Sequence, residues 1–168
     1  MNKMNQVRLE KITLNVGTGE AGEKLEKRIK ILQQLSGKKV VKTLAKKRIP
    51  TWNVRPGMEI GAKVTLRGKN ALETLKKLLK AKNNKLNPKN FDASGNFSFG
   101  IHEYIDVSEL KYDPKLGIFG FDVCVTLTKP GKRVERRKIK KTSVGKKQKI
   151  TKQESMEFAK KQLGVDVQ

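Results

Sequence analysis

The chain has 168 residues, with 39 Lys or Arg against 16 Asp or Glu, and a formal net charge of +23. So much like charge repels itself in the folded state and favours a polyanionic partner such as nucleic acid. No stretch approaches the ~18 apolar residues of a membrane span. The amino terminus lacks the apolar core of a signal peptide, and a lone cysteine excludes an internal disulfide. We expect one cytoplasmic domain over residues 1–168 that does not bind membranes.

The first half of the chain predicts two strands around one helix. Residues 11–16 alternate strictly between polar and apolar side chains, which is typical of a strand with one buried face. A glycine-rich turn over 17–22 leads into a helix with one apolar stripe, which should end at Gly37. Residues 39–44 then predict a second strand. A basic loop over 45–58 follows it.

The middle of the chain begins with its clearest strand, over residues 59–67. The next helix carries a leucine stripe, and Asn70 with Glu73 is expected to cap its start. Residues 83–96 form a long loop rich in Asn, Lys and Gly, which is often functional or mobile at that length. Residues 97–101 predict a short strand.

A hairpin is predicted in the last third of the chain. Residues 119–127 alternate, and a Pro-Gly pair that fits a type II turn separates them from residues 133–139. A basic connector covers 142–149. A final helix starts at a Thr151 cap with a Glu three positions later and ends at Gly164.

Together these elements predict an α+β fold. Each strand has one apolar face, and each helix has a single apolar stripe that covers only such a face. We therefore expect an antiparallel or mixed sheet with helices on one face, similar to an RRM or ferredoxin-like layer, plus the hairpin and the terminal helix. The other face would stay open and basic, with Asn15, Lys63, Thr65 and Arg67 pointing outward. Amide, hydroxyl and cationic donors suit RNA phosphates and ribose hydroxyls.

The turn at 17–22 matches G-x-G-x-x-G between a strand and a helix, which raises the alternative of a dinucleotide site. That fingerprint also requires an acidic residue ~20 positions later, to hold the ribose. Residues 42–48 contain none. A plain tight turn is favoured, and no cofactor is expected.

No catalytic or metal-binding constellation is predicted either. Phe119 and Phe121 resemble the aromatic residues with which RRM domains stack on RNA, but they share parity with apolar neighbours and are assigned to the core. His102 is the only histidine, and nothing near Cys124 favours a reactive thiolate. The chain is not expected to be an enzyme.

Residues 27–58 contain no Asp or Glu, and the segment holds Trp52 between two prolines. Trp52 either anchors the loop in the core or offers RNA a stacking surface beside Arg48 and Arg55. The sequence leaves both interpretations open. The dense basic run at 132–141 is expected to contact phosphate.

Four segments resemble the family of large-subunit ribosomal proteins called L-five, whose members bind 5S ribosomal RNA. They are residues 12–21, 37–48, 54–68 and 98–103, in family order and spacing. The most specific is Val54-Arg-Pro-Gly-Met-Glu-Ile-Gly-Ala-Lys-Val-Thr-Leu-Arg-Gly68. The resemblance covers nearly the whole chain and favours the archaeal and eukaryotic branch.

The resemblance implies that the chain is a structural constituent of the large subunit that holds 5S ribosomal RNA in the central protuberance. Its implied partners are 5S and large-subunit ribosomal RNA, P-site transfer RNA, a neighbouring 5S-binding ribosomal protein and a small-subunit bridge protein. The expected RNA-binding residues are Asn15, Lys38, Thr43, Lys46, Lys47, Lys63, Thr65 and Arg67. Thr51, Trp52, Asn53, Val54 and Arg55 would approach transfer RNA, and Arg133, Arg136, Arg137 and Lys138 would add basic contacts. The alternative is a free RRM-like RNA-binding regulator.

Overall fold

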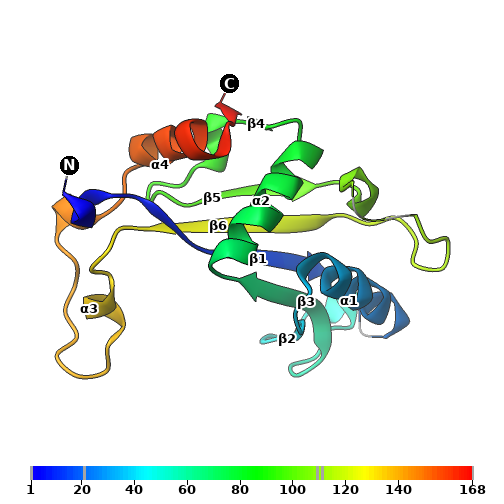
Figure 1. The fold of residues 1–168 in the computed structure, drawn as a ribbon. Coiled ribbons are helices and arrows are strands. Elements are labelled where there is room, and N and C mark those ends of the chain that lie inside the picture. The colour runs from blue at the N-terminus through cyan, green and yellow to red at the C-terminus, as the bar shows by residue number, and fades with distance from the viewer. Residues whose placement is uncertain (1, 21, 109, 111, 168) are drawn as a thin grey trace.

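The computed structural model describes residues 2–20, 22–108, 110 and 112–167. Its main sheet has five antiparallel strands in the order β2-β3-β1-β6-β5 (Figure 1). The strands are β1 (Arg8–Gly17), β2 (Val41–Leu44), β3 (Glu59–Leu66), β5 (Phe97–Ile101) and β6 (Phe121–Thr128). Two short strands, β4 (Lys85–Leu86) and β7 (Asp166–Val167), pair in parallel outside it.

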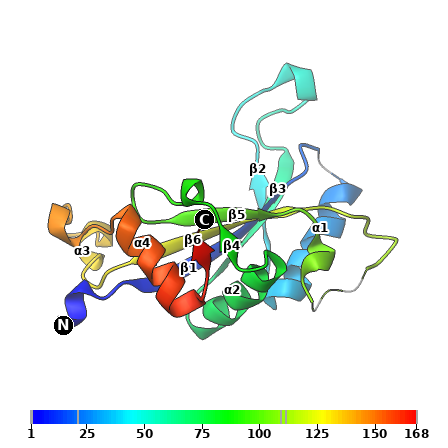
Figure 2. The same ribbon diagram turned by 90° about the horizontal axis from the view of Figure 1, so that it is seen from above.

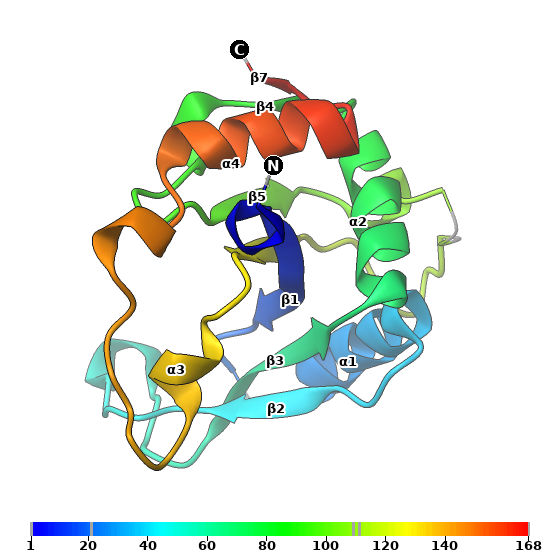
Figure 3. The same ribbon diagram turned by 60° about the vertical axis from the view of Figure 1, so that its left-hand side comes forward.

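Three helices pack against one face of this sheet: α1 (Glu23–Ser36), α2 (Lys69–Ala81) and α4 (Lys152–Phe158), which continues as a π-helix over Ala159–Leu163. The one-turn helix α3 (Arg133–Arg136) and the loop directly after it lie away from them, beside the opposite face (Figure 3). Single 3₁₀ turns cover Lys3–Asn5, Pro50–Trp52, Pro88–Asn90, Tyr104–Asp106 and Lys146–Gln148. None of the helices in the described ranges is long and apolar enough to cross a membrane.

The core lies between the sheet and these three helices. In β1, Ile12, Leu14 and Val16 are buried, and the alternate side chains are partly exposed. Leu75 and Leu78 of α2 pack onto the same layer and are fully buried. Burying one such side chain contributes about 1.5–3 kcal/mol, so the alternation in the strands decides which face the helices cover. The predicted α+β layer with one covered face is confirmed.

The hairpin predicted from residues 119–127 and 133–139 is wrong. β6 pairs with β1 on one side and with β5 on the other, so neither of its edges is free for a further strand. The Pro130-Gly131 turn instead leads into α3, and the N–H of Thr142 donates to the carbonyl of Val134 at 3.3 Å. The basic segment therefore leaves the sheet.

Two boundary predictions for α2 and its following loop need correction. α2 begins at Lys69 with Gly68 as its N-cap, so Asn70 is not the cap. The segment 83–96 is not a free loop, because it contains β4 and a 3₁₀ turn and buries Phe91 in the core.

Three other predicted helix ends are confirmed. The Thr151 side chain accepts from the N–H of Glu154, whose carboxylate accepts from the N–H of Thr151. Gly37 and Gly164 adopt the left-handed conformation that closes their helices.

Candidate nucleic-acid interface

We call the sheet side opposite the three packed helices the open face. Its side chains come from alternate positions on neighbouring strands, and the register aligns them: Thr13 lies opposite Thr65 and Cys124, and Asn15 lies opposite Lys63 and Asp122. The open face comprises Lys11, Thr13, Asn15, Lys63, Thr65, Ser98, Gly100, Asp122, Cys124 and Thr126, together with Arg67 directly after β3. Lys63, Thr65 and Arg67 are exposed, and Asn15 is half-buried by its neighbours on the sheet. The predicted outward orientation of Asn15, Thr65 and Arg67 is confirmed.

The two halves of the open face differ in chemistry. The β3 half presents the cations of Lys63 and Arg67. The β5–β6 half forms a shallow hollow with neighbouring β1, and its lining includes Asn15, Ser98, Gly100 and the carboxylate of Asp122. Cations suit phosphates, and small polar residues let a ribose or a base edge approach the backbone closely. The face can therefore take a sugar–phosphate chain along one side and its sugars or bases along the other.

A β-bulge places an acidic residue at the end of this face. The register of β1 and β6 shifts between Leu9 and Lys11, which leaves Glu10 outside the regular pairing. The side chain of Glu10 is only 8% exposed, and its Oε1 lies 2.5 Å from Nη2 of Arg136 and 3.6 Å from Nη1 of Arg67. This contact ties α3 to the open face. The sequence does not predict it, because nothing in the pattern of residues 8–17 marks a bulge.

The edge strand β2 adds to the same side of the sheet. Thr43 is paired with Gly61, and a Cβ built on Gly61 would lie 2.8 Å from Thr43 Oγ1, so the threonine side chain lies over the glycine. Lys38 is exposed just before this strand, and Lys46 and Lys47 are exposed just after it. The structure thus brings these expected contacts to the edge beside β3.

Residues 45–58 form an arm that projects from the sheet (Figure 2). Ile49 and Val54 exchange backbone hydrogen bonds of 2.9 and 3.1 Å, which closes the tip into a small hairpin. Trp52 at that tip is 69% exposed, so it is not a core anchor. The neighbouring tip residues Thr51, Asn53 and Arg55 are also exposed. Val54 is 2% exposed, so its side chain holds the arm together and cannot face a partner.

The basic segment after β6 is anchored by a nearly buried lysine. Lys129 Nζ lies 2.7 Å from Glu154 Oε1 at the start of α4 and donates to the carbonyl of Lys149. Burial raises the pKa of Glu154, but the hydrogen bond and charge of Lys129 and the N–H of Thr151 lower it more, so the net pKa lies below its usual value. Arg133, Arg136, Arg137 and Lys138 are exposed on the anchored segment.

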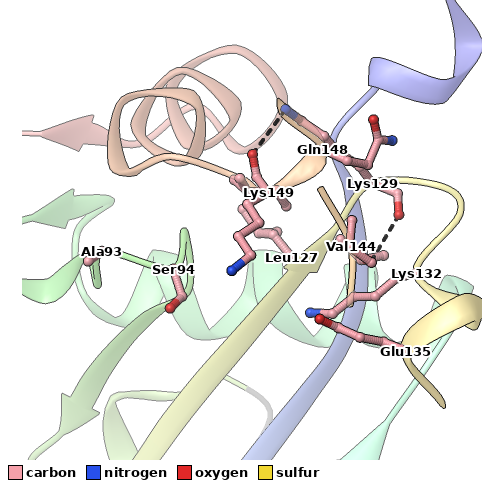
Figure 4. A pocket seen from close by; sticks show the side chains of 11 residues that line it. Ala93, Ser94, Leu127, Lys129, Lys132, Glu135, Val144, Gln148 and Lys149 are labelled. Atoms are coloured by element: carbon pink, nitrogen blue, oxygen red, sulfur yellow. Dashed lines mark hydrogen bonds between the residues drawn. The ribbon is translucent and has the colours of Figure 1, made fainter. Parts of the chain in front are cut away.

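A cavity of about 290 Å³ lies where this segment leaves β6 (Figure 4). Lys129, Lys132, Glu135 and Gln148 line it, with Leu127 at its apolar side. Gln148 Nε2 donates to the carbonyl of Pro130 at 3.0 Å, which ties the connector to the end of β6. The lining also includes Lys149, and the charge of Lys129 is already paired with Glu154.

The features that could have indicated an enzyme have structural roles. The turn after β1 is bound to β3, because the N–H of Thr18 donates to the carbonyl of Ile60 at 2.9 Å; Ala21 of that turn lies outside the described residues. Phe119 is buried, as predicted. Cys124 is exposed, but partial desolvation raises the pKa of its thiol and the charge of Asp122 raises it further, so the thiol stays protonated at neutral pH. Within the described ranges, no three His, Cys, Asp or Glu side chains gather as metal ligands.

Sequence comparison supplies the family. The model described as ribosomal protein L5 matches residues 2–55, and the model of the C-terminus of the same ribosomal family matches residues 59–158. The chain belongs to the ribosomal protein L5 family. The large ribosomal subunit protein uL5 of Nanoarchaeum equitans is 49% identical over 165 residues, which is 98% of this chain and 97% of that protein. The protein of the same name in Sulfurisphaera tokodaii is 48% identical, and the match covers 99% of this chain and 95% of that protein.

Membership of the L5 family confirms the main functional prediction. The chain is a non-enzymatic constituent of the large ribosomal subunit, its partner is ribosomal RNA, and its place is the cytoplasmic ribosome. A third similar uL5, from Methanococcus maripaludis, is 46% identical over 98% of this chain and 92% of its own length. All three relatives are archaeal, which agrees with the predicted branch. The rival interpretations of a nucleotide-dependent enzyme and a free regulator are set aside.

Proposed function

We propose that this chain binds 5S ribosomal RNA on its open face and helps to hold that RNA in the central protuberance. The observation that carries the proposal is the polar side of the sheet, with the cations of Lys63 and Arg67, that the three packed helices leave accessible. The resemblance to L-five proteins supplies 5S RNA as the ligand. The whole chain would act as one RNA-binding unit, because β1 from its first third is the central strand of the sheet.

The contacts we propose follow the open face and its β2 edge. Lys38, Lys46, Lys47, Lys63 and Arg67 would bind phosphates, and Asn15, Thr43 and Thr65 would donate to sugars or base edges. Thr65 and Asn15 lie on adjacent strands, which places an amide and a hydroxyl beside the cations. The basic tail residues Arg133, Arg137 and Lys138 would extend the phosphate contacts beyond the sheet.

The projecting arm would serve a second RNA. Its exposed tip offers the indole of Trp52 for stacking, next to the cation of Arg55. We propose that this tip approaches transfer RNA in the P site. Neighbouring contacts would involve another 5S-binding ribosomal protein and the small-subunit bridge protein, as the family resemblance implies.

A paired substitution tests the open face. Lys63→Ala with Thr65→Ala removes one cation and one hydroxyl from β3, and 5S RNA affinity should fall about tenfold or more, since a phosphate contact and a hydrogen bond are lost. Binding is measured by titration of labelled 5S RNA at fixed salt. The matched control is Lys76→Ala on the exposed side of α2, which should change affinity less than twofold. Equal losses in both variants would point to general charge and against a defined face.

A further inference from the structure

We propose that Arg67 and Arg136 form a clamp for a single backbone phosphate of ribosomal RNA, and that Glu10 is the residue that positions them. This proposal rests on the proposed binding of RNA to the open face. It assigns a joint role to two arginines from distant segments, one directly after β3 and one in α3.

The convergence of the two arginines is the first observation. Both contact the same carboxylate oxygen, Oε1 of Glu10, at 3.6 and 2.5 Å. The contacting nitrogens of the two arginines can therefore be no farther apart than the sum of these two distances. Two guanidinium groups repel each other at such separations. The carboxylate between them offsets that repulsion and leaves a cluster with a net charge of about +1.

The exposure of the three side chains is the second observation. The Glu10 side chain is 8% exposed, whereas those of Arg67 and Arg136 are 57% and 52% exposed. Each guanidinium has five N–H donors, and one contact with Glu10 leaves most of them available. A guanidinium group can donate two parallel hydrogen bonds to the oxygens of one phosphate. Holding the guanidinium in place before the phosphate arrives lowers the entropy lost on binding.

The third observation is the cost of this arrangement. Oε2 of Glu10 is buried and makes no hydrogen bond within the described part of the chain. Buried acceptors are nearly always bonded, because an unpaired one is destabilising by about 1–3 kcal/mol. A buried carboxylate with an unpaired oxygen is poorly explained by stability alone. The arginine donors beside Glu10 that remain available indicate anion binding.

The decisive variant is Glu10→Gln, because two models predict opposite results. General electrostatics predicts tighter RNA binding, since a negative charge is removed from the binding face. The clamp predicts binding about tenfold weaker, because the arginines are no longer held together. The slope of log affinity against log salt concentration should also become shallower, by the amount of about one phosphate contact. The control is Glu23→Gln, which breaks an exposed Glu23–Lys27 pair of 3.1 Å on α1 and should leave affinity within twofold.

Two further variants exclude a purely structural effect. Arg136→Lys keeps the charge on an exposed side chain but loses the fork, and it should also weaken binding about tenfold. In an Arg67→Ala, Arg136→Ala background, Glu10→Gln should weaken binding no further, because there is nothing left to position. Thermal unfolding of each variant checks the fold, and if Glu10→Gln unfolds, Arg136→Lys decides alone.

Several outcomes overturn the clamp: unchanged or tighter binding by folded Glu10→Gln, wild-type affinity of Arg136→Lys, or a full additional loss in the arginine-free background. Failure of the proposed function looks different, because the wild-type chain would then show no preference for 5S RNA over other large-subunit RNA. In that case the same variants are titrated with the large-subunit RNA that the wild type binds, and the same outcomes for those affinities support or overturn the clamp.

Discussion

The Trp52 side chain is expected to contribute to RNA binding and little to the stability of the fold. A tryptophan that is 69% exposed gains little stabilisation from burial. Its position at the tip of a closed arm, beside exposed Arg55, fits stacking on a nucleotide. The side chain of Val54 two residues later points into the arm and holds the arm's shape.

Trp52→Ala should therefore leave the free energy of unfolding within about 0.5 kcal/mol of the wild type. Large subunits reconstituted with this variant should bind P-site transfer RNA about tenfold more weakly, because a stacked base is worth about 1–3 kcal/mol. Ile139→Ala is the control, since that side chain is 80% exposed in a different loop. A marked loss of stability in Trp52→Ala would show that the indole is a structural anchor after all.

At the scale of elements, one glycine of β3, Gly61, lies in close contact with the backbone of β1 and with a side chain of β2. A Cβ on Gly61 would lie 2.7 Å from the carbonyl oxygen of Val16 and 2.8 Å from Thr43 Oγ1, closer than real contacts allow. Its register partner in β1, Gly17, faces open space among the described residues. An alanine at each of these two glycines therefore compares a crowded position in β3 with an open position in β1.

Gly61→Ala should destabilise the fold by about 1–3 kcal/mol, because the added methyl group would collide with the backbone carbonyl oxygen of Val16 in β1 and displace the Thr43 side chain in β2. It should also weaken 5S RNA binding, since Thr43 lies over that glycine. Gly17→Ala should change stability by less than about 0.5 kcal/mol. Denaturant unfolding of both variants gives the measurement, and equal effects would exclude close packing at Gly61 as the cause.

The sequence predicted the elements better than their pairing. Alternation over 11–16 and 59–67 located β1 and β3 and the orientation of Asn15 and Thr65, because a period of two is a local property. The false hairpin after β6 shows the limit: local turn residues cannot reveal that both edges of a strand are already paired. The role of Glu10 could not be predicted for the same reason, since a bulge and the arrival of Arg136 are decided by tertiary pairing.

At the scale of the whole molecule, charge governs two opposing responses to salt. The net charge of +23 destabilises the free protein through self-repulsion, and the same charge attracts RNA. Screening by salt weakens both effects. The free protein and its RNA complex should therefore respond in opposite directions.

Raising the salt concentration from about 50 to 200 mM should lower RNA affinity by about three to five decades if 6–10 phosphates are engaged. Over the same range the melting temperature of the free protein should rise. Titrations and thermal melts at matched salt concentrations test both halves. An affinity that stays flat would exclude a phosphate-dominated interface.

The central place of β1 has a consequence for synthesis. Its two neighbours, β3 and β6, come from the middle and the last third of the chain, so the first strand to leave the exit tunnel waits longest for its second neighbour. Such long-range pairing slows folding and leaves β1 with unpaired backbone groups along its edge and an uncovered apolar face on the nascent polypeptide. A chaperone that shields this strand until Thr128 has left the exit tunnel would match the order in which the sheet closes.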